Sequence, residues 1–192
     1  MLIEQMLFIN GEWKKVSTEG FDSKESQLVF VFGHPALLNN ETVFNHIKDT
    51  YTSSEIVYCS TAGEILGEKA YDQTVSVTAI KFEKTKIDSI STNIQNHENS
   101  HDCGKFLRNS FDNKQLKCVF VISDGTLING SDLVAGLNEV NTNGVLITGG
   151  LAGDGAKFEK TFTSLNAAPS SGNITAIGFY GEHIEFGHGS LG

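Results

Sequence analysis

The sequence lacks the features of membrane-spanning, secreted and disulfide-stabilised chains. No apolar run approaches the roughly 20 residues that a transmembrane helix needs. The first residues, MLIEQMLFINGEW, carry acidic and amide side chains without a basic start, unlike a signal peptide. Cys59, Cys103 and Cys118 are an odd number of cysteines without a C-x-x-C pair, which favours reduced thiols. We therefore expect a cytoplasmic protein with no membrane partner.

Basic residues are scarce as well. The chain has 14 Lys and Arg against 23 Asp and Glu, which gives a formal net charge of −9. Nucleic-acid binding normally requires a basic cluster, and the sequence contains none. The 192 residues include 39% hydrophobic residues, enough for a packed core. We expect a globular protein that binds no nucleic acid.

Alternating strand and helix patterns predict an α/β fold. Apolar runs typical of buried strands lie at 28–32, 56–59, 118–122 and 145–148. Helices are expected after three N-cap positions, which are Asn39 or Asn40, Ser100, and Ser131-Asp132. Further strands are expected at 74–82, 86–94, 159–166, 174–180 and 183–187. The pattern indicates a mixed parallel and antiparallel β-sheet, either one large sheet or two packed sheets, with about three helices.

Short polar loops follow three of the buried strands. They are CSTAGE (59–64), SDGTLINGSD (123–132) and GGLAGDG (149–155). Ligands of open α/β sheets bind at the carboxyl ends of strands, where glycines let backbone amides approach an anionic group. Carboxylates can hold an ammonium group, and serine and threonine supply hydroxyls. The candidate ligand-binding residues are Ser60, Thr61, Glu64, Ser123, Asp124, Gly149, Gly150, Gly153 and Asp154. The alternative is that these residues only shape turns and caps.

The ordered segments CSTAGE, VSVTAI, VFVISDGTLINGSDL and ITGGLAGDGAKFEKT resemble the N-terminal half of the FIST sensory domain, from about Gln27 to Gly189. The resemblance implies an intracellular sensor domain of signal-transduction proteins that binds small ligands such as amino acids. It establishes no catalytic activity, and we expect no cofactor. It also implies a C-terminal sensor half or a signalling output domain as a partner.

The chain departs from that family at both ends. Leu7 to Ile9, Asn10-Gly11 and Glu12-Trp13 predict a hairpin where an amphipathic helix is expected. The chain stops at GHGSLG, where the C-terminal half of such a sensor would begin. We therefore assign 1–26 to an N-terminal hairpin and connection. We assign 27–192 to a FIST N-terminal-like α/β domain whose C-terminal half is absent.

Three patterns suggest enzymes. His97-Glu98-Asn99-Ser100-His101 is a literal H-E-x-x-H zinc motif, but an N-cap at Ser100 would place its first two residues in a loop. Ser123-Asp124-Gly125-Thr126-Leu127 is similar to a haloacid-dehalogenase loop, yet Ile122 stands where that chemistry needs an aspartate nucleophile. Cys59 would need a base such as His34 or His188. We expect no catalytic residue and no metal site.

The sequence thus favours a non-catalytic sensory domain that binds an amino acid or small organic acid through glycine-rich strand-end loops. One alternative is a protein-interaction module whose last strands, 174–187, dock a C-terminal half or an output domain. A metal- or Cys-dependent hydrolase is the remote alternative.

Overall fold

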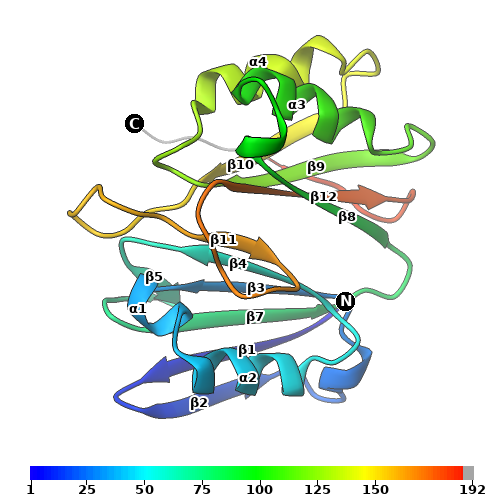
Figure 1. Cartoon of the computed structure of the whole chain (residues 1–192). Coiled ribbons are helices and arrows are strands. Elements are labelled where there is room, and N and C mark those ends of the chain that lie inside the picture. The colour runs from blue at the N-terminus through cyan, green and yellow to red at the C-terminus, as the bar shows by residue number, and fades with distance from the viewer. Residues whose placement is uncertain (188–192) are drawn as a thin grey trace.

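Two β-sheets stack face to face and carry helices on their outer faces, which gives four layers (Figure 1). The structure is a computed structural model and describes residues 1–187. The six-stranded sheet has the order β11 (Thr163–Leu165), β4 (Glu55–Ser60), β3 (Leu28–Gly33), β7 (Val75–Lys81), β1 (Leu2–Ile9) and β2 (Glu12–Ser17). The four-stranded sheet has the order β10 (Leu146–Leu151), β9 (Leu116–Ser123), β12 (Asn173–Tyr180) and β8 (Lys86–Asn93).

The remaining elements are a small ribbon and the helices. The ribbon consists of β5 (Glu64–Leu66) and β6 (Lys69–Tyr71). The α-helices are α1 (Pro35–Leu38), α2 (Glu41–Thr50), α3 (Ser100–Asn109) and α4 (Gly130–Glu139), and single 3-10 turns lie at Ser23–Glu25 and Ile94–Asn96. Strands β3 and β4 are parallel, as are β9 and β10, whereas the other pairs are antiparallel. This confirms the predicted α/β fold with mixed sheets and selects two packed sheets over one.

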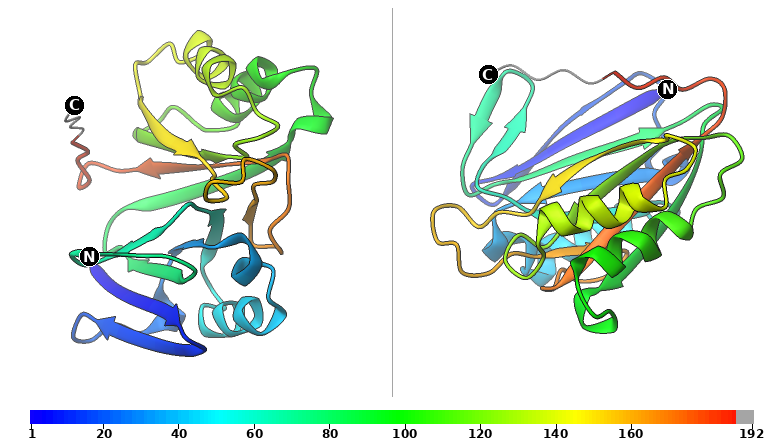
Figure 2. Two further views of the ribbon diagram at one scale, coloured as in Figure 1. Left: turned by 90° about the vertical axis from the view of Figure 1, so that its left-hand side faces the viewer. Right: turned by 90° about the horizontal axis from the view of Figure 1, so that it is seen from above.

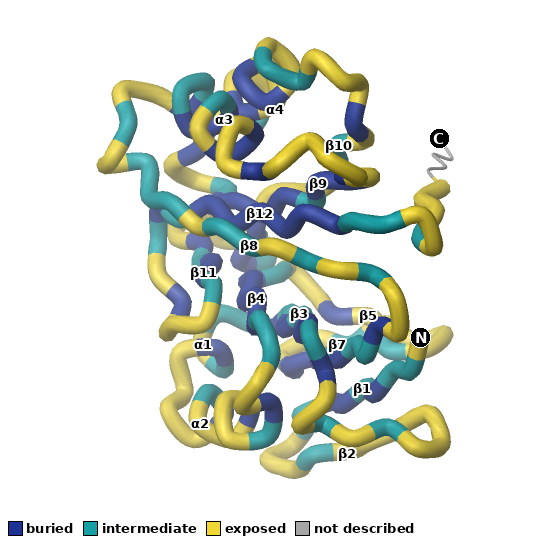
Figure 3. Tube along the Cα trace, turned by 90° about the vertical axis from the view of Figure 1, so that its right-hand side faces the viewer, coloured by how far each residue is buried: buried dark blue, intermediate teal, exposed yellow. Residues whose placement is uncertain are grey.

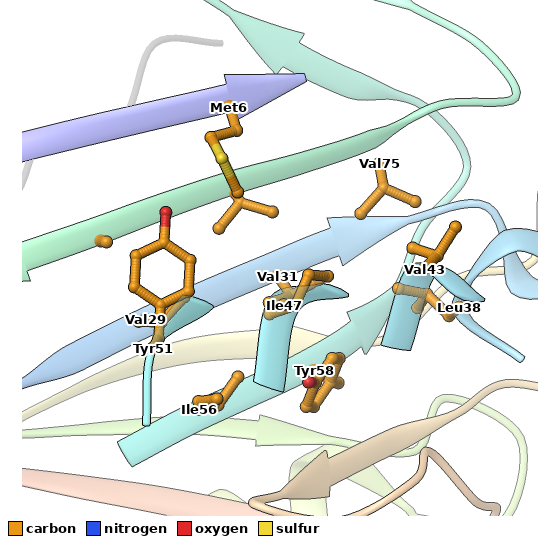
Figure 4. Close-up of a cluster of buried hydrophobic side chains, with 12 residues drawn as sticks. Met6, Val29, Val31, Leu38, Val43, Ile47, Tyr51, Ile56, Tyr58 and Val75 are labelled. Carbon is orange, nitrogen blue, oxygen red and sulfur yellow. The ribbon is translucent and has the colours of Figure 1, made fainter. Parts of the chain in front are cut away.

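An apolar layer fills the space between the two sheets. It includes Phe30 of β3 and Phe120 of β9, whose rings meet edge to face with centroids 5.2 Å apart. The outer face of the six-stranded sheet packs against α2, where Val29 and Val31 lie against Ile47 (Figure 4). Because alternate residues of β3 face opposite sides of its sheet, this strand contributes side chains both to the layer between the sheets and to the core under α2.

Helices α3 and α4 lie side by side over the outer face of the four-stranded sheet (Figure 2). Their close approach requires two glycines. A Cβ on Gly104 would stand 2.3 Å from the carbonyl oxygen of Leu133, and a Cβ on Gly136 would stand 1.9 Å from that of His101. Within residues 1–187, no helix combines the length and apolarity that crossing a membrane demands.

Two predicted helix caps were wrong by one or two residues. Asn99 caps α3 and Asn129 caps α4, because each amide oxygen accepts backbone N–H groups of the first helical turn. The Ser100 hydroxyl instead accepts the N–H of Asn129 at 3.0 Å and so joins the starts of the two helices. The cap predicted at Asn40 is confirmed, since its side chain accepts the N–H groups of Thr42 and Val43.

Three predicted strands also differ from the structure. The strand expected at 159–166 is confined to β11, because the start of that segment forms a loop around Asp154. Residues 183–187 form no strand. Strand β12 is paired on both sides, by β9 and by β8. The prediction that the strands at 174–187 dock a partner is therefore wrong for β12, because β12 lies inside its sheet and has no free edge. Residues 188–192 lie outside the described part of the chain. The strand expected to end at Thr148 continues through Gly149, Gly150 and Leu151.

The N-terminal hairpin extends the six-stranded sheet through a pairing of β1 with β7. Asn10 and Gly11 form its turn with φ values of 53° and 82°. Glu4 of β1 is only 1% exposed and forms an ion pair with Lys15. It also accepts the hydroxyls of Tyr51 at 2.7 Å and Ser17 at 2.8 Å. The buried Glu4 carboxylate therefore joins the hairpin to the end of α2.

We predict that Glu4→Ala lowers the free energy of unfolding by about 3 kcal/mol, because it leaves the Tyr51 hydroxyl and the Lys15 ammonium without their partner. Urea denaturation of the purified chain measures the change. The matched control is Glu12→Ala, at an exposed position of the same hairpin. Equal stability of the two variants would show that the buried carboxylate contributes nothing.

Candidate functional site

The three predicted loops meet at one end of the sandwich. The N–H of Ala152 donates to the carbonyl of Ser123 at 2.8 Å, and the N–H of Gly153 donates to the carbonyl of Ser60 at 2.8 Å. Ser123 ends β9 in one sheet and Ser60 ends β4 in the other. The segment that follows β10 thus connects the carboxyl ends of strands from both sheets.

Asp124 is buried at this junction, and its carboxylate is fully occupied by the chain itself. One oxygen accepts the N–H groups of Thr126 at 2.7 Å and Leu127 at 2.8 Å, together with the Thr126 hydroxyl. The other oxygen accepts the N–H of Gly172 at 2.8 Å. Burial alone would raise the pKa of Asp124, but the donors on Gly172, Leu127 and Thr126 together hold this pKa below its ordinary value.

Asp154 organises the loop that follows β10 in the same manner. Its carboxylate accepts the N–H groups of Phe158 at 2.9 Å, Glu159 at 2.7 Å and Lys160 at 2.9 Å. The hydrogen bonds from Lys160 and Glu159 are the main reason that the pKa of Asp154 is lowered. The loop therefore curls around this carboxylate and projects the side chain of Phe158, which is 85% exposed.

The loop after β4 is held by Glu64, which is buried. One carboxylate oxygen accepts the Thr61 hydroxyl at 2.5 Å, and the other accepts the hydroxyl of Thr74 at 2.6 Å and its N–H at 3.2 Å. The Ser60 hydroxyl accepts the N–H of Phe162 at 2.9 Å. These side chains of the predicted set thus bond to the chain itself.

A hollow of about 720 Å³ opens between α4 and the strands β9 and β10. Its floor includes Ser123, Gly149 and Gly150 from the predicted set. Its apolar walls come from both the helix and the strands, and include Val121, Leu133, Val134, Leu137, Ile147 and Leu151. Among the described residues that line it, none carries a charge. The hollow can therefore accommodate an apolar body with a small number of hydrogen-bonding groups.

The Ser123 hydroxyl differs from the other predicted polar groups. Its side chain is 1% exposed and lines the hollow, yet Oγ finds no hydrogen-bond partner among the described residues. A buried hydroxyl without a partner costs free energy, so such atoms are rare in folded proteins. Gly149 also lines the hollow, and its close approach to β9 leaves no room for a side chain, since a Cβ there would stand 1.7 Å from the carbonyl oxygen of Val121.

No sequence pattern indicates that a helix forms one wall of the hollow. Leu133 and Leu137 of α4 pack in the core over the four-stranded sheet and also line the hollow. The sequence feature that could have indicated this hollow is the pair of glycines after the apolar run at 145–148, because a glycine inside a strand often marks the close approach of a ligand or another backbone. The pattern predicts a loop there, but both glycines lie within β10.

A smaller hollow of about 260 Å³ lies on the other side of the junction. It is bounded by α1 and by the loop around Asp154, and His34, Lys157, Glu159 and Lys160 contribute to its wall. This hollow is polar and carries charges of both signs. It contains Asp154 from the predicted set, whose oxygens already accept three backbone N–H groups.

The structure separates the residues of the H-E-x-x-H motif. His97 bonds to the Thr92 hydroxyl at 2.7 Å, whereas His101 faces Glu139 of α4 at 2.9 Å. The helix begins only at Ser100, so the two histidines do not share a helical face. Among the residues described, no three His, Cys, Asp or Glu side chains are grouped so that they could hold a metal ion.

Cys59 and Asp124, which belong to the other two patterns that suggest enzymes, are both buried. Burial raises the pKa of the Cys59 thiol to about 12, so it stays protonated at neutral pH. His188, one of its two suggested bases, lies outside the described residues. Asp124 of the haloacid-dehalogenase-like loop has its carboxylate enclosed by four hydrogen bonds, and Ile122 packs in the core between the sheets.

We predict that Asp124→Asn lowers the free energy of unfolding by about 2 kcal/mol at pH 7, because an amide NH₂ would face a backbone donor. The folded-state pKa of Asp124 is lowered. Its contribution to stability is therefore complete above the unfolded-state pKa of about 3.9 and is lost as the pH falls through the folded-state value.

Urea titrations between neutral and acidic pH test both statements about Asp124. Asp49→Asn, at an exposed position of α2, is the control and should reproduce the wild type. A variant Asp124→Asn with wild-type stability at pH 7, or with undiminished sensitivity to acid, would contradict the assigned role.

The part of the chain that contains these loops and hollows matches a known protein family. Among curated proteins, none matches the chain. A family model described as the FIST N domain matches residues 27–192, which include all three loops and every residue that lines the larger hollow. The resemblance noted in the sequence is confirmed. Because the match covers most of the chain, the protein belongs to the FIST N domain family, a family of sensory and signalling domains.

Proposed function

We propose that this chain is a non-catalytic ligand-binding domain of a signalling protein, and that its ligand occupies the hollow between α4 and β10. The observation that carries the proposal is the buried Ser123 hydroxyl, which lines the hollow and lacks a partner in the described structure. The family provides the sensory context. The hollow provides a volume suitable for a small molecule.

The lining limits the class of ligand. An apolar wall without a charged residue favours a ligand with an aliphatic or aromatic body. The Ser123 hydroxyl can donate to a carboxylate or carbonyl oxygen or accept from an amine. An amino acid with an apolar side chain, or a small organic acid, fits this lining.

The nine residues predicted to bind ligand then divide into two groups. We assign ligand contact to Ser123, Gly149 and Gly150, which border the hollow. The other residues hold the surrounding loops through internal hydrogen bonds, and they are Ser60, Thr61, Glu64, Asp124, Gly153 and Asp154. A ligand that orders β10 and its following loop would shift the population of loop conformations, which is how a domain without chemistry can transmit a signal.

A protein-interaction module is the second candidate. It is favoured by the exposed aromatic ring of Phe158, which the loop around Asp154 presents to solvent between Lys157 and Glu159. A C-terminal sensor half or a signalling output domain with an apolar socket and a rim that carries charges of both signs would be complementary to this loop. This candidate predicts that no small molecule binds the chain.

A thermal-shift screen against the standard amino acids and short organic acids tests the first proposal. A ligand at 100 times its dissociation constant adds about 2.7 kcal/mol to stability. We predict that Ser123→Ala weakens binding of the best compound about tenfold, equivalent to about 1.4 kcal/mol. The same variant should keep or gain stability without ligand, because it removes an unsatisfied buried hydroxyl.

Two further variants make the test specific. Ser60→Ala removes a hydroxyl that accepts a hydrogen bond, so it should lower stability by about 1 kcal/mol and leave the intrinsic affinity unchanged. Val134→Trp should abolish binding by filling the hollow from a half-exposed position on α4. The proposal is wrong if no compound binds, or if binding survives both Ser123→Ala and Val134→Trp.

A further inference from the structure

The two large sheets have four edge strands, and three of them are protected against pairing with another chain. Strand β2 carries Glu12, Lys14 and Lys15, and β8 carries Lys86 and Asp88. Strand β11 has only three residues. Charges and short length are the usual devices that stop edge strands from pairing with other chains. The fourth edge, β10, has neither.

Strand β10 is six residues long, apolar and uncharged, with the sequence LITGGL. Leu146 is 36% exposed and Leu151 is 53% exposed, whereas β9 and β12 in the same sheet are mostly buried (Figure 3). In a chain with a net charge of −9, the whole stretch 140–153 contains no charged residue. Two copies of the chain could therefore approach along this stretch without like charges facing each other.

From this unprotected edge we infer that two copies of the chain pair through β10, edge to edge, to form a dimer. A two-fold axis perpendicular to the sheet brings the two β10 strands together antiparallel, and the four-stranded sheets become one continuous sheet. The outward N–H and C=O groups of each strand then find partners. Leu146 and Leu151 of both copies lose part of their exposure to water.

The two glycines of β10 differ in the space around them. A Cβ on Gly150 would meet nothing within 4 Å, so this position can accept a side chain as a test. A Cβ on Gly149 would stand 1.7 Å from the carbonyl oxygen of Val121 in β9, so this position cannot. Association does not require the proposed ligand. Because Ile147, Gly149 and Leu151 also line the hollow, a bound ligand and a paired strand would be direct neighbours if both proposals hold.

Sedimentation velocity of the purified chain, from micromolar to near-millimolar concentration, tests the dimer. The average mass should rise with concentration from 20.8 kDa toward twice that value. Leu146→Lys should weaken association at least about tenfold, because it places a charge at the unprotected edge. Gly150→Lys adds a charge where the structure leaves open space, and it tests the same edge if the first variant folds poorly.

Val16→Lys is the matched control, since it makes the same kind of change at an exposed position of the already charged edge β2. It should associate like the wild type. Hydrogen exchange of the β10 amides should slow as the wild-type concentration rises. A wild type that stays monomeric overturns the inference, and so does association that survives both β10 variants or that Val16→Lys disrupts. The wild-type sedimentation experiment contains no ligand, so a monomer there overturns the dimer without bearing on the ligand proposal.

Discussion

Two backbone hydrogen bonds directly after β10 connect the two sheets at the end where the polar loops lie. The N–H of Ala152 donates to the carbonyl of Ser123 in one sheet, and the N–H of Gly153 donates to the carbonyl of Ser60 in the other. Two consecutive residues thus connect the carboxyl ends of strands from both sheets. The junction tolerates little added bulk, since a Cβ on Gly125 would stand 2.1 Å from the carbonyl oxygen of Ala152. Parallel pairing with β9 holds β10 from Leu146 to Leu151, and the two hydrogen bonds hold the chain directly after it, beside the hollow.

The buried carboxylates around the junction share a structural role. Asp124, Asp154 and Glu64 each accept several hydrogen bonds from nearby backbone or hydroxyl groups. Polar loops at the ends of buried strands need such acceptors, because unpaired N–H groups would otherwise be costly. The Ser123 hydroxyl is buried near these satisfied groups and has no partner among the described residues, which is why the proposed ligand is assigned to the hollow that Ser123 lines.

The fold could be predicted from the sequence because strand and helix patterns are local. The four apolar runs that indicate buried strands became β3, β4, β9 and β10, but β10 is an exposed edge strand and not a buried one. The polar loops expected after these strands do meet at one end of the sandwich. The division into two sheets depends on long-range pairing, such as β12 inserting between β9 and β8, which no local pattern specifies. Side-chain roles were equally inaccessible, because an aspartate that binds a ligand and one that holds a turn look alike in sequence.

Amide chemical shifts of the ¹⁵N-labelled chain, titrated with the compound that stabilises it most, test the central claim most directly. The account predicts that the changes concentrate on Ser123, Gly149 and Gly150 and along α4. Changes concentrated instead around His34 and Lys157, at the smaller hollow, would contradict the account and place the ligand on the other side of the junction.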